Sequence, residues 1–143
     1  MSGLTLGQAR DIVAGARAHG AEAGFKPLTV VALDAGGHVV VAEREDGSSN
    51  GRFDVARGKA NAALTLGMGS RALMGRAEEQ AYFVTAVGAA VGGSFVPVPG
   101  GVLVRDTDGA LLGAVGISGD NSDNDEAAAV AGIESAGLAA QPD

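Results

Sequence analysis

The chain has 143 residues, a formal net charge of −7 and no cysteine. Its length fits one domain, since domains cluster at about 100–150 residues, and with 46% apolar residues it can build its own core. An acidic surface repels phosphate backbones, which argues against nucleic acid as a partner. Without cysteine the chain forms no disulfide, thiolate metal site or iron–sulfur cluster.

The N-terminal segment 1–5 lacks the basic stretch and the apolar run of a secretory signal. Gly, Asp or Arg interrupts every apolar stretch before it reaches the length of about 18 residues that indicates a membrane span. We therefore expect a cytoplasmic protein that does not insert into membranes.

The first part of the chain predicts a helix followed by a hairpin. Thr5 and Gln8 have the spacing of a capping box, in which two side chains satisfy free amides at a helix start. Apolar residues then recur at helical spacing: Ala9, Ile12, Val13 and Ala16. Two β-prone runs, 28–34 and 39–44, flank Ala35-Gly36-Gly37, whose glycines allow the positive φ angles of a tight turn.

The middle of the chain predicts helices. One follows the polar loop 45–51 and ends at the glycine-rich segment 67–70. Its apolar side consists of Phe53, Ala56, Ala60, Ala63 and Leu64. A further helical stretch covers 72–91, with a break near Gly75. Its expected buried stripe consists of Tyr82, Phe83, Ala86, Val87 and Ala90.

The last part predicts a second hairpin and a final helix. Segment 92–101 is rich in proline and glycine, so an extended, irregular backbone is expected. Strands follow at 102–105 and 111–118, joined by a short turn. Ser122, with Asp125 three residues later, starts a helix that runs to about Ala136, and the tail after it should fray.

The predicted order is therefore helix, hairpin, helices, hairpin, helix. Two hairpins in one antiparallel sheet, covered by helices, make an α+β domain. Short turns join the strands of each pair, which argues against parallel βαβ winding. We expect one domain over residues 1–143, with its core at about 4–138.

The two histidines are candidate ligand-binding residues. His19 lies seven residues after Ile12 and continues the edge of the apolar face of the first helix. It is either a helix-end histidine that interacts with backbone carbonyls or an axial ligand to a haem lying against that helix. His38 directly follows the Gly-Gly turn, where it is either a surface residue or a ligand contact.

Lys59 is the most suggestive basic residue, because a long cationic side chain has little local reason to stand in the alanine-rich segment 56–63. It either snorkels or forms a salt bridge within the protein, or pairs with a ligand carboxylate, or loses its proton and acts as a base or amine. Asp125 and Glu126, in the first turn of the last helix, are candidate acid–base groups; helix capping is the alternative.

A main-chain site is the last candidate. Pro99, Gly100, Gly101 and Val102 directly precede a strand and present backbone amides with little side-chain bulk. Amides presented in this way bind carboxylates or propionates, although the same residues are equally suited to turning a corner.

Several segments together resemble the GlcG/HbpS family. They read VALDAGGHV at 31–39, REDG at 44–47, ARGKANAA at 56–63, PVPGGV at 97–102, LGAVGISG at 112–119 and DEA at 125–127. This family includes haem-binding and haem-degrading proteins and the C-terminal domain of PduO-type corrinoid adenosyltransferases. The resemblance extends over about residues 4–138.

The resemblance implies a profilin-like antiparallel sheet flanked by helices, and self-association into dimers or larger rings, octamers among them. It also implies haem as a cofactor in some members. Where a histidine on the first helix ligates haem in relatives, His19 is the nearest candidate in this chain.

Three functions stay open at this point. The first is a small-ligand-binding protein, most simply a haem-binding one, with His19 or His38 at the iron. The second is a cofactor-independent lyase or isomerase for a small oxo- or hydroxy-acid. There Lys59 and Arg44 hold the carboxylate, the amides of 99–102 stabilise negative charge, and Asp125 or Glu126 moves protons. The third is an accessory subunit of a larger complex.

Overall fold

The structure is a computed structural model and describes residues 3–143. Met1 and Ser2, the first residues of the N-terminal segment 1–5, lie outside the described residues. The helices are α1 (Leu6–Ala23), α2 (Arg52–Leu66), α3 (Ser70–Glu79), α4 (Ala81–Ala90) and α5 (Ser122–Ser135). The strands are β1 (Thr29–Asp34), β2 (Val39–Arg44), β3 (Gly101–Arg105), β4 (Leu111–Ser118) and β5 (Ala139–Gln141).

The strands form one five-stranded sheet in the order β2-β1-β4-β3-β5, in which every pairing is antiparallel. Both predicted hairpins are confirmed, because β1 pairs with β2 and β3 pairs with β4. The pairing of β1 with β4 joins the hairpins, with Thr29 opposite Ser118 and Asp34 opposite Gly113. The predicted α+β class is confirmed.

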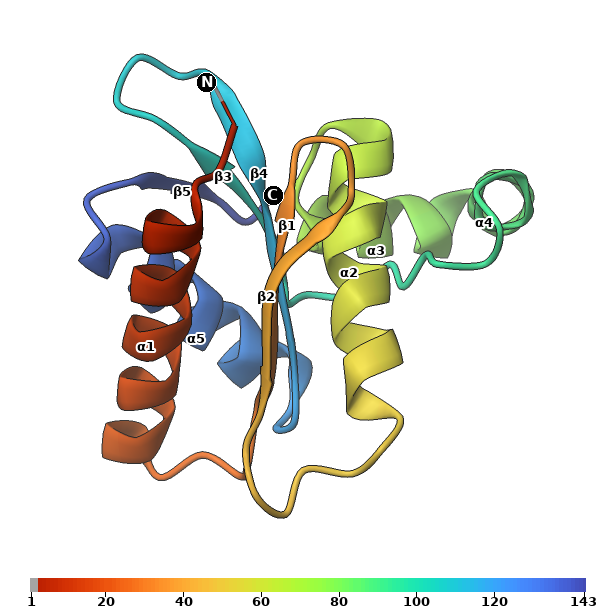
Figure 1. Ribbon diagram of the computed structural model, residues 1–143. Helices are drawn as coiled ribbons and strands as arrows, with labels where there is room; N and C mark the ends of the chain where they lie inside the picture. The colour runs from red at the N-terminus through yellow and green to blue at the C-terminus, as the bar shows by residue number, and fades with distance from the viewer. Residues whose placement is uncertain (1–2) are drawn as a thin grey trace.

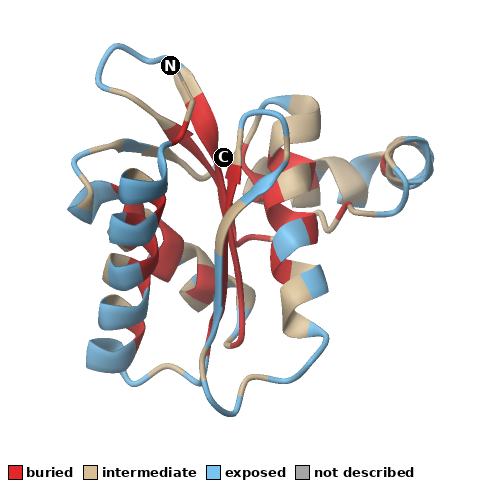
Figure 2. Ribbon diagram, in the orientation of Figure 1, coloured by how far each residue is buried: buried red, intermediate tan, exposed pale blue. Residues whose placement is uncertain are grey.

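Helices cover both faces of the sheet (Figure 1). The alternation of side chains along a strand sends residues to the two faces in turn. Val30, Ala32, Val115 and Ile117 pack in one cluster with residues of α1 and α5. Val31, Leu33, Leu103 and Ala114 pack in another with Ala56, Ala60 and Ala63 of α2. Figure 2 shows the resulting buried zones on either side of the central strands.

Small residues let α2 lie directly on the sheet. A Cβ placed on Gly116 of β4 would be 1.8 Å from the carbonyl oxygen of Ala56, and one on Gly101 of β3 would be 2.2 Å from that of Lys59. The glycines of these strands are therefore required for close backbone approach. The capping box at the start of α1 is also present, with Thr5 Oγ1 accepting a hydrogen bond from the Gln8 amide at 3.1 Å.

Three details differ from the sequence expectations, and the first concerns the stretch 72–91. It breaks at Gln80 and not near Gly75. Gly75 has open space around it and continues the helix, whereas Gln80 leaves helical geometry at φ −137° and ψ 62°. Tyr82 is 73% exposed and Ala86 and Ala90 are exposed as well, because α4 packs beside α3 and away from the sheet, so that Val84 is its buried residue.

The second detail is the C-terminal tail, which does not fray. Residues 139–141 form β5 at the edge of the sheet, with Leu103 opposite Gln141. The amide of Gly69 also donates to the carbonyl of Asp143 at 3.3 Å. The free edge of β3 provides the hydrogen-bonding groups that order this segment.

The third detail is the start of α5. The N-cap is Asn121, whose side chain accepts a hydrogen bond from the Asn124 amide, and Ser122 is the first helical residue. Asparagine is as good an N-cap as serine, so the local pattern did not separate the two positions.

Among residues 3–143, no helix combines the length and the apolar character needed to cross a membrane.

Candidate functional site

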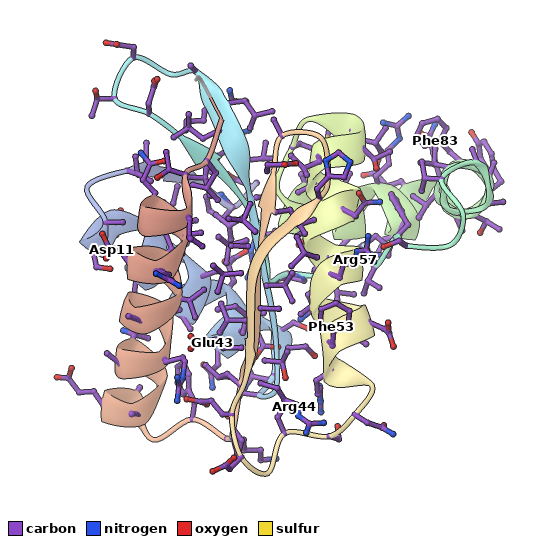
Figure 3. All side chains as sticks on the ribbon, in the orientation of Figure 1. Asp11, Glu43, Arg44, Phe53, Arg57 and Phe83 are labelled. Atoms are coloured by element: carbon purple, nitrogen blue, oxygen red, sulfur yellow. The ribbon has the colours of Figure 1, made fainter. Side chains whose placement is uncertain are left out.

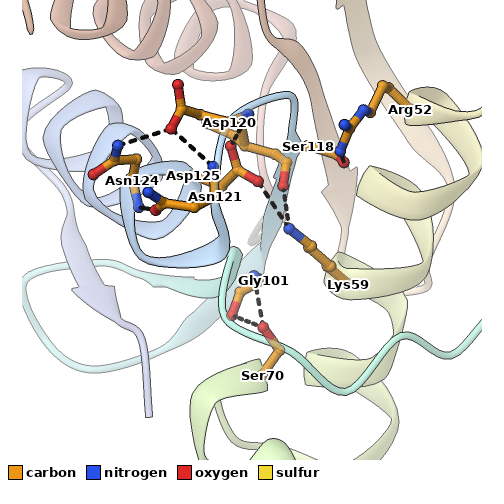
Figure 4. A network of polar contacts seen from close by, with 10 residues as sticks. Arg52, Lys59, Ser70, Gly101, Ser118, Asp120, Asn121, Asn124 and Asp125 are labelled. Carbon is orange, nitrogen blue, oxygen red and sulfur yellow. Dashed lines mark hydrogen bonds and ion pairs between the residues drawn. The ribbon is translucent and has the colours of Figure 1, made fainter. Parts of the chain in front are cut away.

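Lys59 and Asp125 form a buried ion pair. The Lys59 Nζ lies 3.1 Å from Asp125 Oδ2 and donates a second hydrogen bond to the carbonyl oxygen of Ile117 at 2.9 Å. The two side chains are only 3% and 1% exposed. Figure 4 shows the lysine reaching from α2 past the end of β4 to the first turn of α5.

Gly100 makes room for the lysine. A Cβ at this position would be 2.8 Å from Lys59 Nζ and 2.9 Å from the carbonyl oxygen of Ile117. Gly100 also has φ +123°, which other residues rarely adopt. The lyase or isomerase hypothesis places Lys59 and the proline–diglycine corner in one site. The two are therefore neighbours in the fold, as that hypothesis requires.

Burial controls the protonation of this pair. It raises the pKa of Asp125 and lowers the pKa of Lys59, since water no longer solvates either charge. Their mutual attraction acts in the opposite direction on each group. Asp125 Oδ1 also accepts a hydrogen bond from the Asp120 amide at 2.9 Å, which favours the ionised carboxylate. Each charge therefore depends on the presence of the other.

Arg52 joins this region, although the sequence analysis did not single it out. Its Nη1 donates to Ser118 Oγ at 3.0 Å, one residue beyond the Ile117 carbonyl that Lys59 holds. Arg52 and Lys59 are seven residues apart in α2, so they lie on the same face of the helix. That spacing is the signal in the sequence that points to Arg52.

The backbone amides of the diglycine corner are less free than the sequence suggests. The Gly101 amide donates to Ser70 Oγ at 2.7 Å, and the same hydroxyl donates to the Gly101 carbonyl at 3.2 Å. Ser70 is fully buried, as are Pro99 and Gly100. Val102 lies within β3, paired with Val115. Ser70 is a second residue that the sequence analysis missed.

Glu126 belongs to a different contact. Both of its carboxylate oxygens accept from Arg71 Nε, at 3.0 and 3.2 Å, and Arg71 also pairs with Asp123. These bonds join α3 to the start of α5, and they raise the pKa of Arg71. Glu126, with its side chain 15% exposed, is thus engaged in an ion pair apart from Lys59.

The remaining candidates lie away from the buried pair. The His38 side chain is 81% exposed, with Nδ1 3.3 Å from Asp34 Oδ1. Arg44 is exposed at the end of β2, in the lower part of Figure 3. The structure therefore does not bring Arg44 to the carboxylate-binding arrangement with Lys59, because β2 is the outer strand of the sheet on the side of β1.

His19 lies in the other helix layer. It is half-buried near the C-terminal end of α1, and its ring meets that of Phe25 edge to face at a centroid distance of 5.7 Å. With Glu22 and Ala23 it lines a surface cavity of about 310 Å³. Across residues 3–143, no group of three or more His, Asp or Glu side chains is arranged to hold a metal ion.

Comparison with known proteins identifies relatives of this fold. Residues 4–134 match the model of a family described as "Haem degrading protein HbpS-like". The crystal structure of a PduOC–haem complex has a TM-score of 0.84 and 22% identity, with 95% of this chain and 96% of that chain covered. None of the curated protein sequences gives a match.

Two further structures show the same arrangement. A double mutant of HbpS from Streptomyces reticuli has a TM-score of 0.79 and 26% identity, covering 94% of this chain and 87% of that one. The Klebsiella pneumoniae protein ORFY has a TM-score of 0.80 and 21% identity, covering 93% and 90%. The match to HbpS-type folds extends over nearly the whole chain.

Proposed function

We propose that this chain, which belongs to the HbpS-like haem-degrading family, binds haem and that His19 is the axial ligand. The observation that carries the assignment is the position of His19 beside a surface cavity of about 310 Å³. A neutral imidazole is a common haem ligand. The PduOC relative of the same fold was crystallised with haem, which supports this class of ligand.

The cavity beside His19 is open and is lined by His19, Glu22 and Ala23, so one face of a porphyrin would lie against this end of α1. Ligand pockets have volumes of about 300–1,000 Å³, so the cavity is at the small end of the range. Phe25 packs against the imidazole ring and restricts its orientation. A bound haem would supply iron-centred redox chemistry, and His19 would hold it, with Phe25 fixing the orientation of the imidazole ring.

His38 is the competing histidine, and the structure favours it less. Its ring is exposed and its Nδ1 is close to the carboxylate of Asp34, and the side chain is not part of the cavity at His19. A haem at His38 would lose most of the apolar burial that drives porphyrin binding. His38 is therefore the matched control for His19.

A hemin titration tests the proposal. The wild-type chain and His38→Ala should develop a saturating Soret band, and His19→Ala should lose it. A flat spectrum for the wild type at micromolar hemin would show that the chain does not bind haem. If instead His38→Ala loses the band and His19→Ala keeps it, haem binding stands but the ligand assignment is wrong.

The buried amine of Lys59 supports a second candidate, a cofactor-independent enzyme for a small oxo-acid. Burial lowers the pKa of Lys59, and a lysine that loses its proton can form an imine with a carbonyl group. Access requires the Lys59–Asp125 pair to open. Trapping with cyanoborohydride and pyruvate should then add mass to wild-type Lys59 but not to a Lys59→Met variant. No adduct at Lys59 would exclude this route.

Self-association is also proposed, with homodimers or larger rings as the expected states. Exposed apolar residues on α4, with Tyr82 73% exposed, support it, because large apolar side chains are more often buried. Native mass spectrometry of the purified chain tests this expectation. A spectrum of monomers only, at micromolar concentration, would contradict it.

A cytoplasmic location remains a proposal from the sequence.

A further inference from the structure

A second cavity, with charged and hydroxyl side chains in its lining, lies at the end of the sheet where β4 meets α2. It has a volume of about 220 Å³. Its lining residues come from three loops and from the first residue of α2: Lys26, Pro27, Gly47, Ser48, Ser49, Arg52 and Gly119. Two cationic side chains and two hydroxyls therefore meet around one small space.

Arg52 is the central group of this cavity. Within residues 3–143, the polar contact of its side chain is a hydrogen bond from Nη1 to the neutral hydroxyl of Ser118. Arg17 and Arg71 pair with carboxylates, whereas Arg52, like the other arginines of the described residues, has no ion pair, and it lines this cavity. Among residues 3–143, no carboxylate lies within ion-pair distance of Arg52. In a chain of net charge −7, an arginine held in place without an acidic partner is available to an anion.

Asp120 and Glu45 are the carboxylates near this cavity, and neither pairs with Arg52, because other groups already bind them. Asp120 accepts from the amide of Lys26, the amide of Asn121 and the side chain of Asn124, each at 2.8 Å. These bonds lower its pKa to about 2. Glu45 pairs with Arg17 and accepts from the Leu28 amide at 2.7 Å.

The hydroxyls give the cavity further hydrogen-bonding capacity. Ser48 Oγ lies 2.8 Å from Thr29 Oγ1, a buried group that can act as the donor. When Thr29 donates, the proton of Ser48 is free for a ligand oxygen. Gly119 lets two backbone segments that line the cavity approach each other closely, since a Cβ there would be 2.2 Å from the carbonyl oxygen of Pro27.

We propose that this cavity binds a small oxyanion, a phosphate or a short-chain carboxylate, with Arg52 as the principal contact and Lys26 and Ser48 as secondary contacts. The planar guanidinium is suited to paired hydrogen bonds with two oxygens of one anion. The site shares no lining residue with the cavity at His19, so it stands independently of haem binding.

Amide chemical shifts measured during titration test the proposal. Inorganic phosphate and glycolate are added in separate titrations at constant ionic strength, balanced with sodium chloride. Saturating shifts should appear at 47–49 and at Gly119 with at least one of the two anions. The anion that binds more tightly then decides between phosphate and carboxylate as the preferred ligand.

Variants establish which residue holds the anion. Arg52→Gln should weaken the affinity by about tenfold or more, since a charge-assisted hydrogen bond is lost. Arg57→Gln removes the same charge from an exposed position on the same helix and should change the affinity by no more than about twofold. Lys26→Gln, a change at an exposed position, should give an intermediate decrease.

Three results would overturn the proposal. The first is an absence of saturating shifts at these amides with both anions at millimolar concentration. The second is an equal loss of affinity in Arg52→Gln and Arg57→Gln, which would indicate only general electrostatic attraction. The third is unchanged binding in Lys26→Gln together with a folded Arg52→Gln variant that binds as the wild type does.

Discussion

Lys59 and Asp125 connect the two helix layers of this protein across the end of the sheet. Lys59 stands on α2, which covers one face, and Asp125 on α5, which covers the other (Figures 1 and 4). The lysine passes the strand ends only because Gly100 has no side chain. A buried contact between residues 66 positions apart thus fixes how α5 sits relative to α2.

Removing one partner of this pair should be strongly destabilising. Lys59→Met leaves the Asp125 carboxylate buried without a counter-charge, and Asp125→Asn leaves the ammonium in the same state. Each change should lower the free energy of unfolding by about 3–5 kcal/mol, as for other buried pairs. Urea denaturation measures the loss. Lys26→Met, at an exposed lysine, should have little effect, and equal losses in both lysine variants would contradict the prediction.

The two single variants should respond to pH in opposite directions. In Lys59→Met, burial raises the pKa of Asp125 above its ordinary value of 3.8, so the folded state keeps a proton that the unfolded chain releases. Stability is then greatest at low pH and falls as pH rises from about 4 to the raised folded pKa. Thermal unfolding followed over this range measures the slope.

In Asp125→Asn the sign reverses. Burial lowers the pKa of Lys59 below its ordinary value of 10.5, so the unfolded chain binds the proton more tightly than the folded one. Stability then rises with pH from the lowered folded pKa up to about 10.5. Slopes of the same sign in the two variants would show that the pair does not respond to burial as described.

The close approach of α2 to β4 should make Gly116 intolerant of a side chain. Gly116→Ala places a methyl group against the backbone of Ala56, which cannot move without shifting the helix. The free energy of unfolding should fall by about 1–3 kcal/mol or more. Gly75→Ala is the matched control: with open space around it in a helix, it should stabilise by about 0.5–1 kcal/mol. A neutral Gly116→Ala would contradict the observed packing.

The C-terminal strand should contribute to stability. Deleting residues 139–143 removes the pairing of β5 with β3 and the hydrogen bond from Arg105 Nε to Gln141 Oε1 at 2.8 Å. The freed edge of β3 should exchange its amide hydrogens faster and promote association between chains. Hydrogen exchange at 103–105 measures the first effect. Unchanged protection there would show that β5 is not needed to order the edge.

Glu126 should contribute to the stability of the fold and not to ligand binding. Glu126→Gln keeps the size of the side chain but removes the ionic contact with Arg71, and exposed pairs of this kind contribute about 0–1 kcal/mol. We expect a small loss of stability that shrinks at high salt, with hemin binding unchanged. A large loss of hemin binding without a change in stability would instead indicate that Glu126 takes part in ligand binding.

Much of the fold could be predicted from local pattern. The spacing of Thr5 and Gln8 indicated the start of α1, and β-prone runs separated by short turns indicated both hairpins. The nearly unbroken β-prone run 28–34 indicated a strand, and the structure buries its successive residues in two different clusters, one on each face of the sheet. The ordered set of family segments also pointed to the HbpS-like family, which the match over residues 4–134 confirms.

The partners of the functional side chains were decided by tertiary structure. The sequence marked Lys59 as unusual in an alanine-rich helix, but only the packing of α5 against the strand ends supplied Asp125 as its partner. Likewise, the Gly101 amide was free in the sequence pattern and is bound by Ser70 in the fold. Local patterns report backbone preferences over a few residues, whereas these contacts join positions 31 to 66 apart and depend on where whole elements pack.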